Sequence, residues 1–168
     1  EHNRQSLRIV DEIEQKYPGF AGLNLTWEVR EGLMKHADLA SLTGPRPDFP
    51  NRSPSLEAQV ANLADEITYY GHDLDDGLDA GLLTEKQLVR DVSVWREAAA
   101  LVRREHGRLP DEVRRFFTIR TILDEQVKDV VRTTESNLRT SGIRSPDDVR
   151  RLARPLVRYS PVRRRENL

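Results

Sequence analysis

Hydrophobic and polar positions separate most clearly between residues 53 and 81, where apolar side chains recur every three or four residues. This spacing is the helical period, so it predicts a long amphipathic helix with one buried face. Ser53 is expected to cap its start, Pro54 to occupy the first helical position, and Gly81 to end it. The predicted buried face consists of Leu56, Val60, Leu63, Ile67, Tyr70, Leu74 and Leu78.

The same period and local start and stop signals predict further helices in the first third of the chain. Residues 3–17 read as a helix that Pro18 and Gly19 stop, and Thr26 is expected to cap a short one. Residues 37–52 are rich in proline and glycine and have few periodic apolar positions, so they are expected to form a long loop.

Four helical segments are expected after the central helix. One is opened by a capping box at Thr84 to Gln87, one is capped by Ser93 and runs through His106 to Gly107, one runs from Pro110 to about Thr140, and a short one starts at Pro146 after Ser145. The inner side of the second is expected to carry Trp95, Ala99 and Val102. No segment shows the alternation of apolar and polar residues that a half-buried strand needs. The pattern therefore predicts an all-α fold.

The face of the central helix opposite its apolar side carries chemistry-bearing side chains. The helical repeat of about 3.6 residues places them on one side of the helix. They are Asp65, Tyr69, His72, Asp73 and Asp76. Acidic residues on an outer helix face usually meet only water. Aspartate is nevertheless a poor helix former, and a neutral surface would more naturally carry Glu and Lys. On residue types alone, solvation and a functional site both stay open.

Three stretches of sequence stand in an order and spacing that identify a family. They are EHNRQSLRIV at 1–10, GLNLTWEVREGLMKH at 22–36 and EAQVANLADEITYYGHDLDDGL at 57–78. They resemble the HD-domain deoxynucleoside triphosphate triphosphohydrolases, the bacterial dGTPase-like family. The resemblance implies a helical HD-phosphohydrolase-like bundle. Residues 1–82 would be the C-terminal part of the HD core, and 83–168 an accessory helical region.

Members of this family bind one divalent metal through a His, an adjacent His-Asp pair and a distant Asp. By resemblance, only the last ligand is present, as Asp65, while His72 and Asp73 belong to a later motif. The chain is therefore expected to be an internal piece of a longer enzyme, without the upstream HD motif and inactive by itself. The intact protein is expected to hydrolyse dGTP or other dNTPs to deoxynucleoside and triphosphate.

The resemblance also implies roles for individual residues. Asp65 would bind Mg²⁺ or Mn²⁺, with Fe²⁺ as a further candidate, since such cations favour hard oxygen ligands. Tyr69 and Asp73 would face the deoxyribose, and His2 would donate a proton near the scissile phosphate. Arg115 and Arg120 are the candidates for the phosphates, because a planar guanidinium binds phosphate oxygens bidentately.

Composition excludes several kinds of site and of protein. Cysteine is absent, which excludes disulfides and thiolate metal sites, and no apolar run approaches the roughly 18 residues of a membrane span. No signal-peptide pattern is present, so a cytoplasmic protein is expected. The resemblance further implies a homo-oligomer.

Charge is uneven along the chain. From Arg139 to the end there are nine arginines and three acids, although the whole chain has a net charge of −1. These arginines are expected to pair with acids on a neighbouring subunit or to keep a terminal helix soluble, with nucleic-acid binding as the alternative. Two rival functions stay open: another HD phosphohydrolase such as a monophosphate nucleotidase, or a non-catalytic helical module that binds nucleic acid or a partner subunit.

Overall fold

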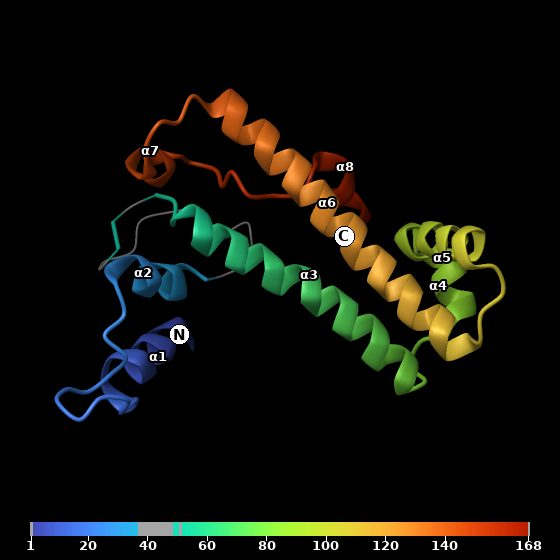
Figure 1. The fold of residues 1–168 in the computed structure, drawn as a ribbon, viewed down its shortest axis with the longest axis horizontal. Coiled ribbons are helices and arrows are strands. Elements are labelled where there is room, and N and C mark those ends of the chain that lie inside the picture. Colours follow the sequence, from blue (N-terminus) through green and yellow to red (C-terminus); the bar gives the residue numbers. More distant parts are fainter. Residues whose placement is uncertain (1, 37–48, 51, 168) are drawn as a thin grey trace. The chain divides into compact units, whose positions relative to one another are not determined.

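The computed structural model describes residues 2–36, 49–50 and 52–167. Its helices are α1 His2–Arg8, the π-helical turn η1 Ile9–Ile13, α2 Trp27–Lys35, α3 Leu56–Asp79, α4 Glu85–Asp91, α5 Ser93–His106, α6 Asp111–Ser141, α7 Pro146–Arg151 and α8 Pro161–Glu166 (Figure 1). Across the described residues there is no strand, and isolated bridges join Gln15 to Gly22 and Tyr17 to Phe20 in the loop before α2. The predicted all-α fold is confirmed.

The chain divides into two compact units, and α3 and α6 each contribute residues to both. The first unit comprises residues 1–63 and 137–157, and the second comprises 64–136 and 158–168. The expected division after residue 82 referred to the family's HD core and stays a prediction.

In the first unit, α1 and η1 are joined to α2 by polar contacts. The side-chain amide of Asn3 donates to the carbonyl oxygens of Met34 at 2.9 Å and His36 at 2.6 Å. Arg30 on α2 forms a bidentate pair with Asp11, with its closest N–O distance at 2.8 Å. These contacts position α1, which carries His2 and Asn3 of the first family stretch.

The start of α3 is held in the first unit by a returning C-terminal segment. Gln59 is fully buried, and its Oε1 accepts hydrogen bonds from the backbone N–H groups of Leu156 at 2.8 Å and Val157 at 3.2 Å. Its amide Nε2 donates to the carbonyl of Pro54 at 3.0 Å. One polar side chain thus satisfies three buried backbone groups.

In the second unit, the hydrophobic core lies where α4, α5 and α6 meet the end of α3. Its buried members are Leu88, Val94, Trp95, Ala98 and Ile122, and the partly buried Leu74, Leu78, Leu83, Val92, Ala99 and Ile119 pack against them. On α3, Gly71 faces Leu123 so closely that a Cβ at this glycine would lie 3.0 Å from the leucine side chain. A side chain at position 71 would therefore require the Leu123 side chain to shift.

Most of the helix predictions are confirmed. The capping box at Thr84 and Gln87 is present, Gly107 ends α5 at a φ of 71°, and α6 and α7 begin where Pro110 and Ser145 predicted. The helix α8 was not predicted. Most of the expected loop at 37–52 lies outside the described residues.

Several local predictions are wrong. The helix expected over 3–17 ends at Ile13, because the carbonyls of Val10 and Glu14 accept instead from Leu23 and Gly22, at 2.8 and 2.7 Å. Ser93 begins α5 but its side chain makes no capping bond, since the N-cap position is Val92.

The start of α3 differs from its prediction as well. Ser53 does not cap the helix; its hydroxyl donates to the carbonyl of Leu152 at 2.9 Å, and Ser55 accepts from the N–H of Ala58 at 3.3 Å. Val60, which was expected inside, is 53% exposed. The helix is rotated so that the neighbouring Gln59 is the buried residue, because Gln59 has backbone partners there.

Candidate functional site

The polar face of α3 lies in the second unit and is exposed over two helical turns. Asp65, Tyr69 and Asp73 follow one another at intervals of four residues, so they lie on one side of the helix about 6 Å apart along its axis. The Tyr69 side chain is 63% exposed, and His72 and Asp76 lie on the same side and are also exposed. The prediction that these residues share an outward face is confirmed, while their roles stay predictions.

The described residues do not form a complete metal site. Within residues 2–36, 49–50 and 52–167, no three His, Asp or Glu side chains gather closely enough to hold a metal ion. One carboxylate cannot satisfy the six or more oxygen ligands that Mg²⁺ or Mn²⁺ prefers. Asp65 therefore fits a metal only as one donor among several.

The two predicted phosphate-binding arginines have different surroundings. On α6, Arg115 places Nε 3.1 Å from Asp75 and Nη2 2.7 Å from Asp79, so it joins α6 to the end of α3. The hydrogen bond to Asp79 raises the pKa of its guanidinium. Arg120 is exposed on α6 and has no ion-pair partner in the part of the chain that the structure describes. Of the two, Arg120 is the one whose donors are open to a ligand.

His2 lies in the first unit as the first residue of α1 and is exposed. Its carbonyl accepts a hydrogen bond from the Ser6 hydroxyl at 3.1 Å, which fixes the backbone of this turn. Its role as a proton donor stays a prediction.

A polar cluster on another side of α3 was missed from the sequence. It consists of Glu66 and Tyr70 on α3, Tyr159 before α8, and Arg164 on α8. The spacing of Glu66 and Tyr70 by four residues was the one local signal, since such residues face each other on a helix. The arginine partner is 98 residues away and could not be found from spacing.

The arginine-rich end forms many ion pairs within its own units. Arg150 lies 3.2 Å from Glu28 and 3.3 Å from Asp147, and Arg151, Arg163 and Arg164 pair with Asp148, Glu166 and Glu66. The Arg150 guanidinium also lies 5.7 Å from the centre of the Trp27 ring. These arginines pair with acids of their own chain, whereas the sequence interpretation placed the partner acids on a neighbouring subunit; nucleic-acid binding stays a prediction.

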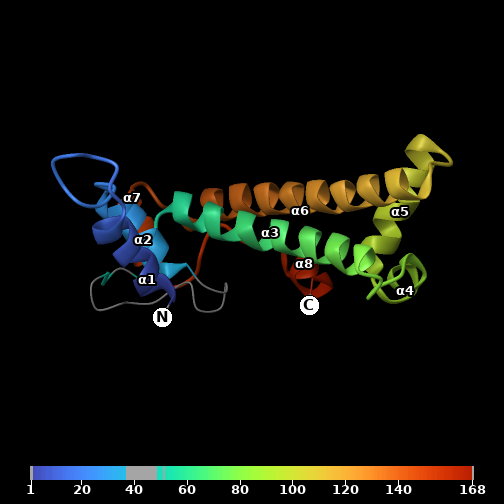
Figure 2. The same cartoon turned by 90° about the horizontal axis from the view of Figure 1, so that it is seen from below.

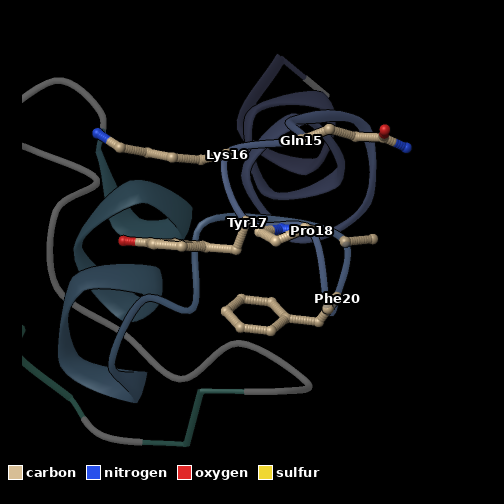
Figure 3. Close-up of a pocket in the computed structure, with 7 residues that line it drawn as sticks. Gln15, Lys16, Tyr17, Pro18 and Phe20 are labelled. Carbon is tan, nitrogen blue, oxygen red and sulfur yellow. The ribbon is translucent and has the colours of Figure 1, made fainter.

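A hollow of about 550 Å³ lies in the first unit, in the loop between η1 and α2 (Figure 3). It is lined by residues 15–21, and the rings of Tyr17 and Phe20 lie with their centres 5.0 Å apart and their planes tilted by 31°. None of the predicted site residues lines it.

The chain is similar in sequence to several known proteins. No protein-family model matches the chain. Curated relatives from Thiobacillus denitrificans, Geobacter sulfurreducens and Bordetella pertussis are 47%, 45% and 44% identical over 96–99% of the chain. Each is named a deoxyguanosinetriphosphate triphosphohydrolase-like protein. The chain belongs to the dGTPase-like family. It spans about 44% of the length of each of these relatives.

Family membership confirms the resemblance read from the three sequence stretches. In this dGTPase-like chain the first two stretches form α1, η1 and α2, and the third forms α3 with its polar face. Among the described residues, no helix is both long enough and apolar enough to cross a membrane.

Proposed function

We propose that the intact protein hydrolyses deoxynucleoside triphosphates, dGTP or dNTPs in general, to deoxynucleoside and inorganic triphosphate in a metal-dependent reaction. Water attacks the α-phosphorus, the bond from phosphorus to the 5′ oxygen breaks, and that oxygen takes up a proton. The observation that carries the proposal is the outward Asp65–Tyr69–Asp73 face of α3 in a chain whose relatives are named triphosphohydrolase-like. Because the chain spans less than half of those relatives, the activity is proposed for the intact protein.

Asp65 would provide one carboxylate ligand from a rigid position in mid-helix, with the other ligands supplied from outside the described residues. A bound Mg²⁺, Mn²⁺ or Fe²⁺ would neutralise phosphate charge and lower the pKa of a water molecule. Mid-helix placement suits this role, because a helix holds its side chains more precisely than a loop does.

Tyr69 and Asp73 would select deoxyribose. Asp73 would accept a hydrogen bond from the 3′-hydroxyl, and the Tyr69 ring beside it would leave little room for a 2′-hydroxyl. Arg120 would bind phosphate oxygens, whereas Arg115 would first have to leave Asp75 and Asp79. His2 would donate the proton to the leaving oxygen.

The test uses the intact protein with each dNTP and with Mg²⁺ or Mn²⁺, and measures the release of inorganic triphosphate. Asp65→Asn is expected to remove at least 99% of the rate, on the order of what a lost metal ligand does, without changing the melting temperature. Glu57→Gln is the matched control, because Glu57 is an exposed acid in the first turn of the same helix. No triphosphate release with any dNTP and either metal would refute the proposal.

Substrate profiling separates the rival functions. A monophosphate nucleotidase would release phosphate from deoxynucleoside monophosphates and leave triphosphates intact. A nucleic-acid-binding module would show salt-sensitive binding without turnover, and the ion pairs of Arg150, Arg151 and Arg163 make this second outcome less expected.

A further inference from the structure

A second side of α3, within the second unit, carries the cluster built on Glu66. Oε1 of Glu66 lies 2.5 Å from Nη1 of Arg164, and it also accepts a hydrogen bond of 3.0 Å from the Tyr70 hydroxyl. The Glu66 side chain is 18% exposed and the Arg164 side chain 35% exposed. The carboxylate is thus largely enclosed, while the guanidinium still reaches solvent.

The position of Arg164 is set by the fold, because α8 is anchored to α6 at both ends. At its start, the N–H of Ser160 donates to Oδ2 of Asp129 at 2.8 Å. At its end, the side-chain amide of Gln126 donates to Oδ1 of Asn167 at 3.3 Å. In the view of Figure 2, α8 is drawn below α3 and α6, and the contact between Arg164 and Glu66 joins α8 to α3.

Tyr159 forms the inner wall of the cluster and is 4% exposed. Its hydroxyl has no hydrogen-bond partner among the described residues. Burial, followed by the charge of Glu66, raises the pKa of this phenol, so the ring stays neutral. A neutral, buried ring beside Glu66 and Arg164 lowers the local dielectric and strengthens their attraction.

The Arg164 guanidinium has two neighbours in the cluster and still reaches solvent. Nη1 binds Glu66, and the guanidinium also lies close to the Tyr70 hydroxyl, where it opposes the rise in the pKa of that phenol that burial and Glu66 cause. The side chain is nevertheless 35% exposed. Two arginines of α6 differ from Arg164: Arg115 is held by two carboxylates, and Arg114 by Glu85 and by Asp111. A guanidinium that is held by a carboxylate and still reaches solvent is preorganised to bind phosphate oxygens.

We propose that Arg164 binds the phosphate chain of the substrate, with Glu66 as the positioning residue that aims its guanidinium. This inference rests on the proposed function. Glu66 directly follows Asp65, and consecutive Cα atoms are about 3.8 Å apart. The guanidinium is therefore anchored to the helical turn that carries the proposed metal ligand. A triphosphate is multiply charged, so its binding requires cations in addition to the metal.

The test titrates inorganic triphosphate into the intact protein in the presence of Mn²⁺ by calorimetry, alongside inhibition of hydrolysis by triphosphate and by deoxynucleoside. Arg164→Ala is expected to weaken triphosphate binding roughly 10- to 100-fold, the effect of a lost charge-assisted hydrogen bond. Inhibition by deoxynucleoside should be unchanged. Arg164→Lys should restore part of the triphosphate affinity, and Glu66→Gln should weaken it less than Arg164→Ala does.

Arg165→Ala is the matched control, because Arg165 is the next arginine of α8 and is exposed. It should leave both binding constants unchanged. Equal weakening of triphosphate and deoxynucleoside binding by Arg164→Ala, or a lower melting temperature with unchanged affinities, would show that Arg164 only attaches α8 and would overturn the inference. Absence of dNTP hydrolysis by the wild-type protein would refute the proposed function instead, and calorimetry would still compare triphosphate binding between the variants.

Discussion

Replacing Gln59 with leucine tests whether one buried side chain holds the returning C-terminal segment in the first unit. In Gln59→Leu, the N–H groups of Leu156 and Val157 lose their acceptor and the carbonyl of Pro54 loses its donor. Leu156 and Val157 are themselves 6% and 2% exposed, so water cannot easily replace the lost partner.

The magnitude follows from the number of groups left without a partner. Each buried, unsatisfied N–H destabilises the fold by about 1–3 kcal/mol. Two such groups, partly offset by burial of the leucine side chain, should lower the free energy of unfolding by about 2–5 kcal/mol. For a protein of this size, each kcal/mol corresponds to a melting-temperature shift of about 2–4 °C.

Urea denaturation of the intact protein measures the total loss, and hydrogen exchange measures where it occurs. The amides of Leu156 and Val157 are expected to lose protection while those of the α5 core keep theirs. Val60→Ala is the control on the next residue, which is 53% exposed, and it should change stability by no more than about 0.5 kcal/mol. An unchanged free energy of unfolding together with full protection of both amides in Gln59→Leu would refute the reasoning.

Two further predictions concern a glycine and a buried phenol. Gly22 has a φ of +79°, and an added Cβ would lie 2.4 Å from the Asp11 carbonyl oxygen, so Gly22→Ala should destabilise by more than about 2 kcal/mol. Gly19→Ala, where a Cβ meets open space, should be nearly neutral in the same denaturation assay, and equal effects of the two would contradict this. The raised pKa of Tyr159 means that its contribution to stability is complete below about pH 10 and is lost as the pH rises toward the folded-state pKa. Above about pH 10, the free energy of unfolding of the wild-type protein should therefore fall more steeply with pH than that of Tyr159→Phe, by roughly 1 kcal/mol per pH unit. Urea denaturation at a series of pH values measures both, and the same pH dependence in the two proteins would refute the raised pKa of Tyr159.

Local signals in the sequence were sufficient for most helices. The capping boxes at Thr84 and Ser145 join groups only three residues apart, and the positive φ of Gly107 ends α5 within one turn. The apolar period placed Trp95 and Val102 on the buried side of α5, where they are 0% and 1% exposed. The shared face of Asp65, Tyr69 and Asp73 follows from the same period.

Contacts between distant residues decided the rest. Glu14 ends η1 because its carbonyl and that of Val10 are taken by Gly22 and Leu23, and no local rule predicts this exchange. Ser53 looked like a helix cap, but its hydroxyl binds a carbonyl 99 residues away.

The candidate site shows the same division. The sequence alone determined the helical period of α3, and with it the outward face that carries Asp65, because helical neighbours lie within four residues of each other. Only the tertiary structure decided that Arg115 forms ion pairs with Asp75 and Asp79, and that Arg164 pairs with Glu66, 98 residues away in the sequence. The physical reason is that charged side chains on different helices pair according to how those helices pack. The helical repeat of one helix does not reveal which residue of another helix will lie beside it.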